Sequence, residues 1–149
     1  MTGRGRSAAV VALAGALLVS LAGCFASPSA ADSSFAQKIP SALEAADLGM
    51  SDAWAERTVD GFTTALAVGM THDTEEITAD QLRQTIDIVL AQNTMSADRL
   101  TLTVYAPDED FIDLQPAASE LGLDLTYSDE YGLNLPMEDV TKVIGGNGS

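Results

Sequence analysis

His72 is the only histidine of the chain, and the carboxylates of Asp73, Glu75 and Glu76 stand close to it in the sequence. General-base catalysis and metal binding both use an imidazole beside carboxylates. A zinc site, however, requires several nitrogen or sulfur ligands in a fixed geometry. Because a single histidine cannot supply them, we predict no metal site here and interpret His72 as a solvated loop residue.

The densest acidic stretch is formed by Asp108, Glu109, Asp110 and Asp113. Calcium takes about six to eight oxygen ligands, which acidic loops can provide. The stretch lacks both the turn glycine and the closing glutamate of the EF-hand pattern. We therefore predict a solvated turn leading into a helix, with Asp113 favoured near the positive helix N-terminus. A calcium site is the alternative interpretation.

No arrangement typical of nucleophilic catalysis occurs in the sequence. There is no Gly-x-Ser-x-Gly motif, and no spacing singles out a serine–histidine pair. Carboxylate pairs that cleave glycosides meet in space rather than in sequence, so a hydrolase built from carboxylates and His72 is an open alternative. The prediction is a protein with no catalytic residue, no cofactor and no metal ion.

Cys24, the only cysteine, closes an apolar segment near the start of the chain. The segment follows Arg4 and Arg6, runs from Ala8 to Val19 and consists almost wholly of Ala, Val and Leu. These are the charged and apolar parts of a secretory signal. The segment is shorter than the roughly 20 apolar residues that a membrane-spanning helix needs.

The residues Leu21, Ala22, Gly23 and Cys24 resemble the lipobox of bacterial lipoproteins. The resemblance implies that the Cys24 thiol receives a diacylglyceryl group and that the chain is cut before Cys24. It also implies a protein held by lipid on the extracytoplasmic side of the cell membrane, where two or more acyl chains anchor stably. The alternative is an ordinary secreted protein, cleaved after residue 26 or 30.

The charge of the chain argues against two classes of partner. The sequence has 22 acidic and seven basic residues, and loss of Arg4 and Arg6 with a signal peptide leaves five basic residues and a net charge of −17. Nucleic-acid binding depends on Lys and Arg at phosphates, and adsorption to an anionic membrane needs basic patches. We therefore predict no nucleic-acid partner, and contact with the membrane only through the lipid anchor.

Composition divides the chain into four parts. Residues 1–23 form the predicted signal peptide, and residues 24–34 form a flexible tether of small and polar residues that begins at the lipidated cysteine. Residues 35–145 suit one domain with one hydrophobic core. Residues 146–149 are predicted to be a disordered tail.

Helix and strand patterns are mixed along residues 35–145, without a strict βαβ alternation. Asp60-Gly61 between two strand-like runs favours a type I′ hairpin turn, and Thr78 with Gln81 has the spacing of a capping box. The predicted helices begin at Pro40, at Thr78, at Asp113 or Pro116, and at Pro136. The predicted strands are residues 53–59, 62–70, 99–106, 123–125 and 133–135. This order indicates an α+β two-layer sandwich, with three to five mostly antiparallel strands and helices packed on one face.

Alternation along the strands assigns two faces to the predicted sheet. The face expected to pack on the helices carries Phe62, Leu66, Val68, Leu100, Leu102 and Val104. The other face carries small and mildly polar residues, namely Thr63, Ala65, Ala67, Gly69, Thr101, Thr103 and Tyr105. It is either an ordinary solvated face or a flat platform for an envelope protein or a glycan, with Trp54 or Tyr105 as anchors.

The chain is also similar to small lipoproteins of unknown function from high-GC Gram-positive bacteria. The features that carry this similarity are the lipobox, Gly61-Phe62 at the start of a strand, and the segment 117–123. The resemblance implies a fold and an envelope location, but no activity. We therefore predict a membrane-anchored, non-enzymatic binding or accessory module. The alternative is a carboxylate-based hydrolase or a metal-dependent envelope factor.

Overall fold

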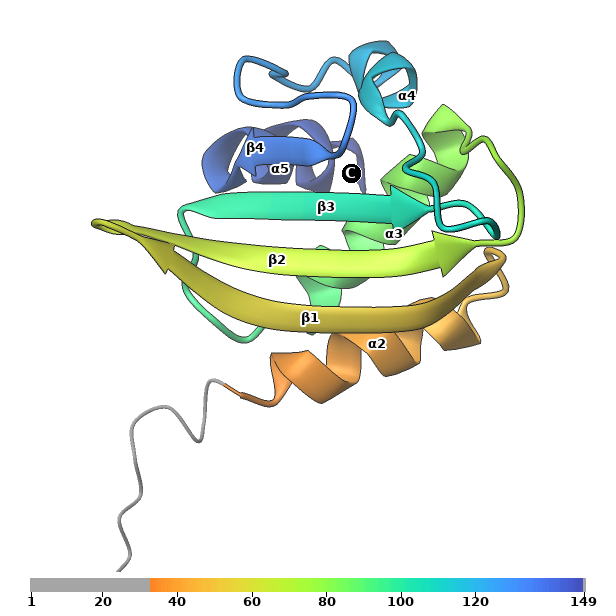
Figure 1. Ribbon diagram of the computed structural model, residues 1–149. Coiled ribbons are helices and arrows are strands. Elements are labelled where there is room, and N and C mark those ends of the chain that lie inside the picture. The colour runs from red at the N-terminus through yellow and green to blue at the C-terminus, as the bar shows by residue number, and fades with distance from the viewer. Residues whose placement is uncertain (1–32, 149) are drawn as a thin grey trace, which may run out of the picture.

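Four strands form one open sheet in the order β1–β2–β3–β4 (Figure 1). The computed structural model describes residues 33–148. The strands are Met50–Asp60 (β1), Thr63–His72 (β2), Arg99–Tyr105 (β3) and Leu133–Pro136 (β4). The helices are Phe35–Ala45 (α2), Ala79–Gln92 (α3), Gln115–Glu120 (α4) and Met137–Val143 (α5), followed by the 3-10 helix Gly145–Gly148 (η1).

The strand pairing is mixed. β1 and β2 are antiparallel, as are β3 and β4, whereas β2 and β3 run parallel. The parallel pair requires a crossover, because a short turn cannot return the chain to the same end of the sheet, and α3 supplies it. The predicted α+β class with mostly antiparallel strands is confirmed. β1 and β4 are the edge strands of the sheet.

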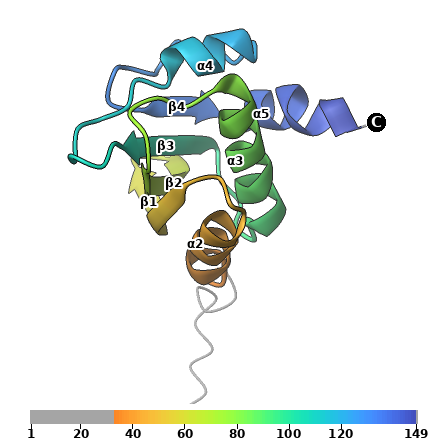
Figure 2. The same cartoon turned by 90° about the vertical axis from the view of Figure 1, so that its right-hand side faces the viewer.

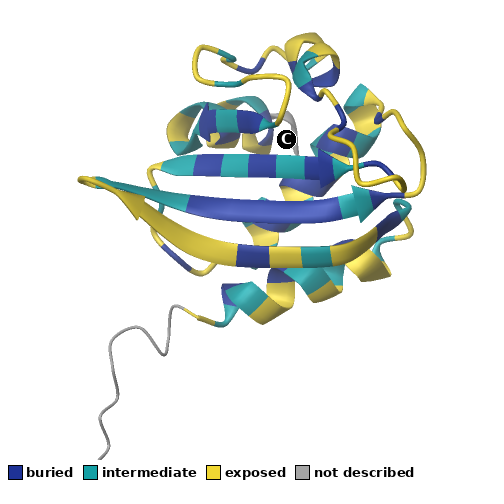
Figure 3. Ribbon diagram, viewed as in Figure 1, coloured by how far each residue is buried: buried dark blue, intermediate teal, exposed yellow. Residues whose placement is uncertain are grey.

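The helices α2, α3 and α5 lie on the same side of the sheet, and no helix within residues 33–148 covers the opposite side (Figure 2). The core fills the space between these layers. Its centre consists of buried aliphatic residues from the two inner strands and from α3, namely Leu66, Val68, Leu100, Leu102, Val104, Leu82, Ile86 and Val89. Burial is continuous along the middle of β2, whereas β1 is exposed over most of its length (Figure 3).

α2 begins at Phe35, five residues before the predicted start, so Pro40 lies inside the helix. Phe35, Ile39 and Leu43 recur every four residues and are all buried, which places them on one stripe of the helix. Burial of each such side chain contributes roughly 1.5–3 kcal/mol. Together they offset the ~3 kcal/mol cost of an internal proline.

The hairpin turn is Gly61-Phe62 rather than Asp60-Gly61, because Asp60 pairs with Thr63. Gly61 has a φ of +60°, whereas Phe62 lies outside the left-handed region. A glycine at the first central position alone is the pattern of a type II′ turn, not of the predicted type I′. Phe62 is consequently fully exposed at the turn and does not belong to the core-facing side of β2.

The capping box of α3 is present as predicted, with Thr78 Oγ1 accepting from the Gln81 N–H and Gln81 Oε1 accepting from the Thr78 N–H. Residues 123–125 form no strand, although Leu123 is buried in the core. Residues 145–148 form η1, where the sequence predicted a disordered tail from residue 146. The predicted lipobox with Cys24, the tether up to residue 32 and Ser149 lie outside the described residues.

Candidate functional site

The residues predicted for an interaction surface all lie on the helix-free side of the sheet. Trp54 of β1 pairs with Gly69 of β2, and Gly69 pairs with Thr103 of β3. Because every second residue of a strand shares a face, these pairs fix the members of the surface. We call this surface the open face, made up of Trp54, Glu56, Thr58, Ala65, Ala67, Gly69, Arg99, Thr101, Thr103 and Tyr105. The five predicted residues Trp54, Ala65, Thr101, Thr103 and Tyr105 are among them.

Trp54 lies against Gly69 at the centre of this face. A β-carbon placed on Gly69 would overlap the Cε2, Cζ2 and Nε1 atoms of the indole. The glycine therefore lets the large ring rest on the backbone of β2, as expected where glycine in a strand permits close approach. Trp54 is still 40% exposed, so the open face keeps an accessible aromatic ring.

A row of three aromatic rings borders the open face at Tyr105, the last residue of β3. The Tyr105 and Phe111 ring centres lie 5.0 Å apart, and the Phe111 and Tyr131 ring centres lie 5.2 Å apart in an edge-to-face arrangement. Both separations are typical of favourable aromatic pairs. A backbone bridge between Tyr105 and Phe111 brings the loop after β3 back to this strand. Phe111 and Tyr131 are exposed, so the loops add aromatic surface to the sheet.

Arg99 connects β3 to β4 and to the loop that precedes β4. Its Nε donates to Asn134 Oδ1 at 2.6 Å, and its guanidinium carbon lies 4.2 Å from the centre of the Tyr127 ring. A guanidinium over an aromatic ring is stabilised by the electron density of the ring. Arg99 therefore holds Tyr127 against the open face.

Three hollows lie along this face. One of about 290 Å³ extends from Thr58 and Ala65 to Tyr127. One of about 190 Å³ lies between Thr103 and Tyr131. A third, of about 380 Å³, lies between Trp54 and Tyr105 and is also bordered by Asp52 and Glu109. The open face is thus a row of shallow depressions between aromatic rings rather than one deep cleft.

Two acidic neighbours, Asp129 and Glu130, affect the titration of the Tyr131 hydroxyl. Its hydrogen bond to Glu130, and then the negative charges of Glu130 and Asp129, raise the pKa of Tyr131 above its ordinary value of 10.0. A phenol that donates to a carboxylate loses its proton less readily. The Tyr131 hydroxyl therefore keeps its proton to a higher pH than an ordinary tyrosine does.

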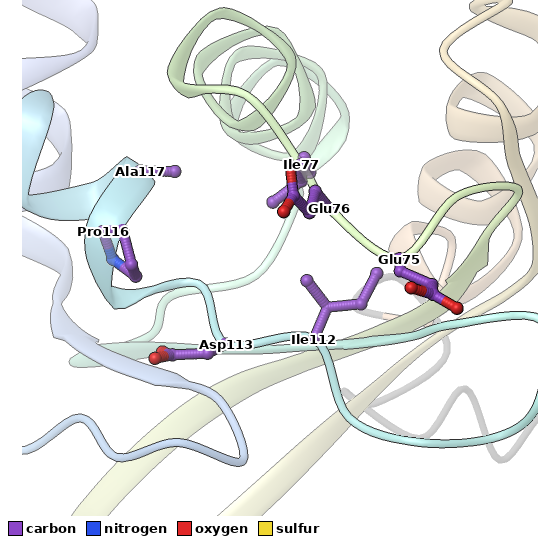
Figure 4. A pocket seen from close by; sticks show the side chains of 7 residues that line it. All are labelled: Glu75, Glu76, Ile77, Ile112, Asp113, Pro116 and Ala117. Carbon is purple, nitrogen blue, oxygen red and sulfur yellow. The ribbon is translucent and has the colours of Figure 1, made fainter.

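A further hollow, of about 390 Å³, lies between the loop after β2 and the start of α4 (Figure 4). Glu75, Glu76 and Asp113 border it, but Figure 4 shows the carboxylates of Glu75 and Asp113 pointing to opposite sides. Asp113 Oδ1 accepts from the Gln115 N–H at 3.0 Å, at the start of α4. Within residues 33–148, no three acidic, histidine or cysteine side chains are grouped closely enough to hold a metal ion.

His72 is buried at the end of β2, not solvated in a loop as predicted. Thr74 contacts His72 Nδ1 through its hydroxyl at 2.9 Å and its backbone N–H at 3.3 Å, and the same hydroxyl donates to the Glu76 carbonyl. Gln81 Oε1 is occupied by the Thr78 N–H, so the Gln81 amide nitrogen donates to His72 Nε2 at 3.3 Å. Both ring nitrogens therefore have hydrogen-bond partners. They make His72 a hydrogen-bonded link between β2 and the start of α3.

Sequence reasoning missed two groups of residues at the open face. The loop aromatics Phe111, Tyr127 and Tyr131 carried no periodic signal, since loops have none. Asp52 was not singled out, and Glu109 was considered only as part of an acidic turn. One signal was present in the composition, because the only tryptophan and all three tyrosines of the chain lie at this face.

Comparison of the chain with protein-family models, with curated proteins and with solved structures finds no match. Among residues 33–148, no helix combines the length and the apolar character that crossing a membrane requires. The function of the open face is therefore inferred from its own geometry and chemistry.

Proposed function

We propose that the chain is a lipid-anchored module of the cell envelope that binds an envelope protein through the open face and catalyses no reaction. The observation that supports this function is the gathering of Trp54 and the three tyrosines around a floor of small residues. Tryptophan and tyrosine are enriched at the residues that contribute most to protein–protein binding. The floor of Ala65, Thr101 and Thr103 lets a partner approach the backbone closely.

Two further features support parts of the proposal. The resemblance of residues 21–24 to a lipobox supports the anchor at Cys24 and the extracytoplasmic location. His72, on which the hydrolase alternative depends, is buried and has hydrogen-bond partners at both ring nitrogens. This environment favours a structural role for the imidazole, in linking β2 to α3, over a role in binding a substrate.

In-cell cross-linking with mass spectrometry of the tagged protein tests the proposal. We would compare the wild type with Ala65→Arg and Thr103→Arg, which place a long charged side chain on the floor of the open face. Ala91→Arg is the matched control, because Ala91 is exposed on α3, on the other side of the sheet. Cys24→Ser removes the predicted lipidation site.

We expect one dominant protein partner that is lost in Ala65→Arg, Thr103→Arg and Cys24→Ser but retained in Ala91→Arg. Equal recovery from all four variants, with unchanged circular dichroism spectra, would contradict binding through the open face. Persistence of Cys24→Ser in the membrane fraction would contradict the lipid anchor. Recovery of a glycan rather than a protein would overturn the choice of partner.

A further inference from the structure

The hollow between Trp54 and Tyr105 differs from the others on the open face in its chemistry. It has a volume of about 380 Å³ and is lined by two aromatic residues and two acidic residues, Trp54, Tyr105, Asp52 and Glu109, together with Met70 and Thr71. Trp54 belongs to β1 and Tyr105 to β3, and these strands lie about 10 Å apart with β2 between them. The Trp54 indole also extends over Gly69 of β2, so the space left between the two aromatic side chains suits a small group rather than a large ring system.

Both carboxylates are carried by unusual backbone. Asp52 has a φ of +48° and Glu109 a φ of +69°, and only one other non-glycine residue within residues 33–148 has a positive φ. Asp52 lies in the irregularity of β1 between Ser51 and Trp54, where the pairing with β2 shifts. Bulges of this kind redirect side chains at the edges of sheets. The two irregular segments, far apart in sequence, meet at this one hollow.

The aromatic side chains at the hollow are held in place from behind. Trp54 rests on Gly69, where no side chain would fit beneath it. Tyr105 packs on Phe111, which in turn packs on Tyr131. Side chains that are already held in place lose little conformational freedom when a ligand binds.

The charge at the hollow is not compensated by the protein. No lysine or arginine borders it, and the ion pair of Arg83 with Asp80 lies elsewhere, on α3. The Asp52 carboxylate accepts only a long 3.4 Å contact from the Ser51 hydroxyl. The whole chain carries a net charge of −15, which attracts cations and repels anions.

We infer that this hollow binds an organic cation, an alkylammonium or a guanidinium group, between Trp54 and Tyr105, with Asp52 and Glu109 as counter-charges. Aromatic rings attract a cation placed within about 6 Å of the ring centre, and recognition of ammonium groups by clustered rings is the usual form of such a site. The inference rests on the proposed function, since it names the chemistry that the open face recognises. A lysine or arginine side chain of a partner protein and a free amine are two sources of the same group.

Fluorescence of Trp54, the only tryptophan, provides the test with the full chain in detergent. One titration would use choline chloride, with its uncharged carbon isostere 3,3-dimethyl-1-butanol and with sodium chloride at equal ionic strength as references. A second would use the peptide Gly-Lys-Gly and the same peptide with an acetylated lysine. We expect saturable changes with the cationic member of each pair. Tighter binding of choline would indicate a free amine, and tighter binding of the peptide would indicate a protein side chain.

Variants assign the response to the hollow. Glu109→Gln and Asp52→Asn remove one charge each without changing shape, and we expect each to weaken cation binding about three- to fivefold, as for a partly exposed ion pair. Tyr105→Leu should weaken it by a similar factor through loss of the ring. Asp110→Asn is the matched control, because it removes the same charge from the same turn but does not border the hollow.

Equal responses to choline and to its uncharged isostere, or equal affinity in Glu109→Gln and Asp110→Asn, would overturn the inference. The cross-linking experiment is independent of these titrations. A partner lost in Ala65→Arg, together with no response to any cation, would leave the binding face in place and contradict the cation site alone.

Discussion

The indole of Trp54 occupies the place beside Gly69 where any larger residue would put its β-carbon. The two residues are direct neighbours across β1 and β2, so the size of one limits the position of the other. This pair decides whether the open face presents a ring that lies on the sheet or one displaced into solvent.

Gly69→Ala is expected to displace Trp54 and to destabilise the fold by about 1–3 kcal/mol, the usual cost of overpacking. Urea unfolding measures the stability, and the emission maximum of Trp54 should shift toward longer wavelength as the ring becomes more solvated. Gly146→Ala is the control, because a β-carbon there has no atom within 4 Å. An unchanged emission spectrum in Gly69→Ala would show that the ring does not depend on the glycine.

Arg99→Lys tests the connection between β3, β4 and the Tyr127 loop. Lysine keeps the charge but cannot both donate to Asn134 and stack on the ring as a planar guanidinium does. We expect a loss of about 1 kcal/mol in the free energy of unfolding. Arg57→Lys on exposed β1 should change it by less than about 0.5 kcal/mol. Equal effects of the two substitutions would argue against a special role for Arg99.

Gln81→Ala removes two interactions with one substitution, the capping box with Thr78 and the hydrogen bond to His72. Because His72 is buried, its Nε2 would lose its partner without gaining water. The expected cost is about 1–3 kcal/mol. Gln84→Ala, on an exposed turn of the same helix, should be nearly neutral. Thermal unfolding of both variants compares them, and similar midpoints would contradict the link between β2 and α3.

Thr126→Val tests the titration of Asp124. The Thr126 hydroxyl and then its backbone N–H donate to Asp124 Oδ1 and hold the pKa of Asp124 below its ordinary value of 3.8. A carboxyl whose pKa is lower in the folded state stabilises the fold above pH 3.8, and this contribution disappears as the pH falls through the folded pKa. The valine variant should move the pKa of Asp124 upward.

NMR titration of the side-chain carboxyl carbon measures this shift directly. Thr58→Val, on β1, should leave the titration of Asp124 unchanged. An Asp124 pKa that is the same in Thr126→Val and in the wild type would contradict the assignment to the hydroxyl bond.

Local patterns predicted the elements whose local and tertiary preferences agree. The capping box of Thr78 and Gln81 and the alternation through Leu100, Leu102 and Val104 depend on nearby residues, and both are present. Pro40 was misplaced because its local preference for a helix start is weaker than the burial of Phe35. His72 was predicted to lie in a loop, although the alternation of buried residues through Leu66, Val68 and Met70 continues to it.

The residues of the open face also divide into those that a local pattern predicts and those that it does not. Trp54, Ala65 and Thr103 could be assigned to one side of the sheet from the period of a strand alone. The loop residues that complete it could not be assigned, because their positions depend on the bridge between Tyr105 and Phe111 and on the contact of Arg99 with Tyr127. Such contacts form only when the chain has folded back on itself.

The irregularity in β1 has a consequence for how copies of this chain meet one another. β1 is an outer strand of 11 residues, and the unpaired backbone of an outer strand is a template for sheet-to-sheet aggregation. Its bulge beside Asp52 interrupts that template, and Glu56 and Asp60 add exposed negative charge along it. Two copies that approached edge to edge would bring like charges together across a strand that is not straight. These features of β1 disfavour edge-to-edge pairing between copies of the chain.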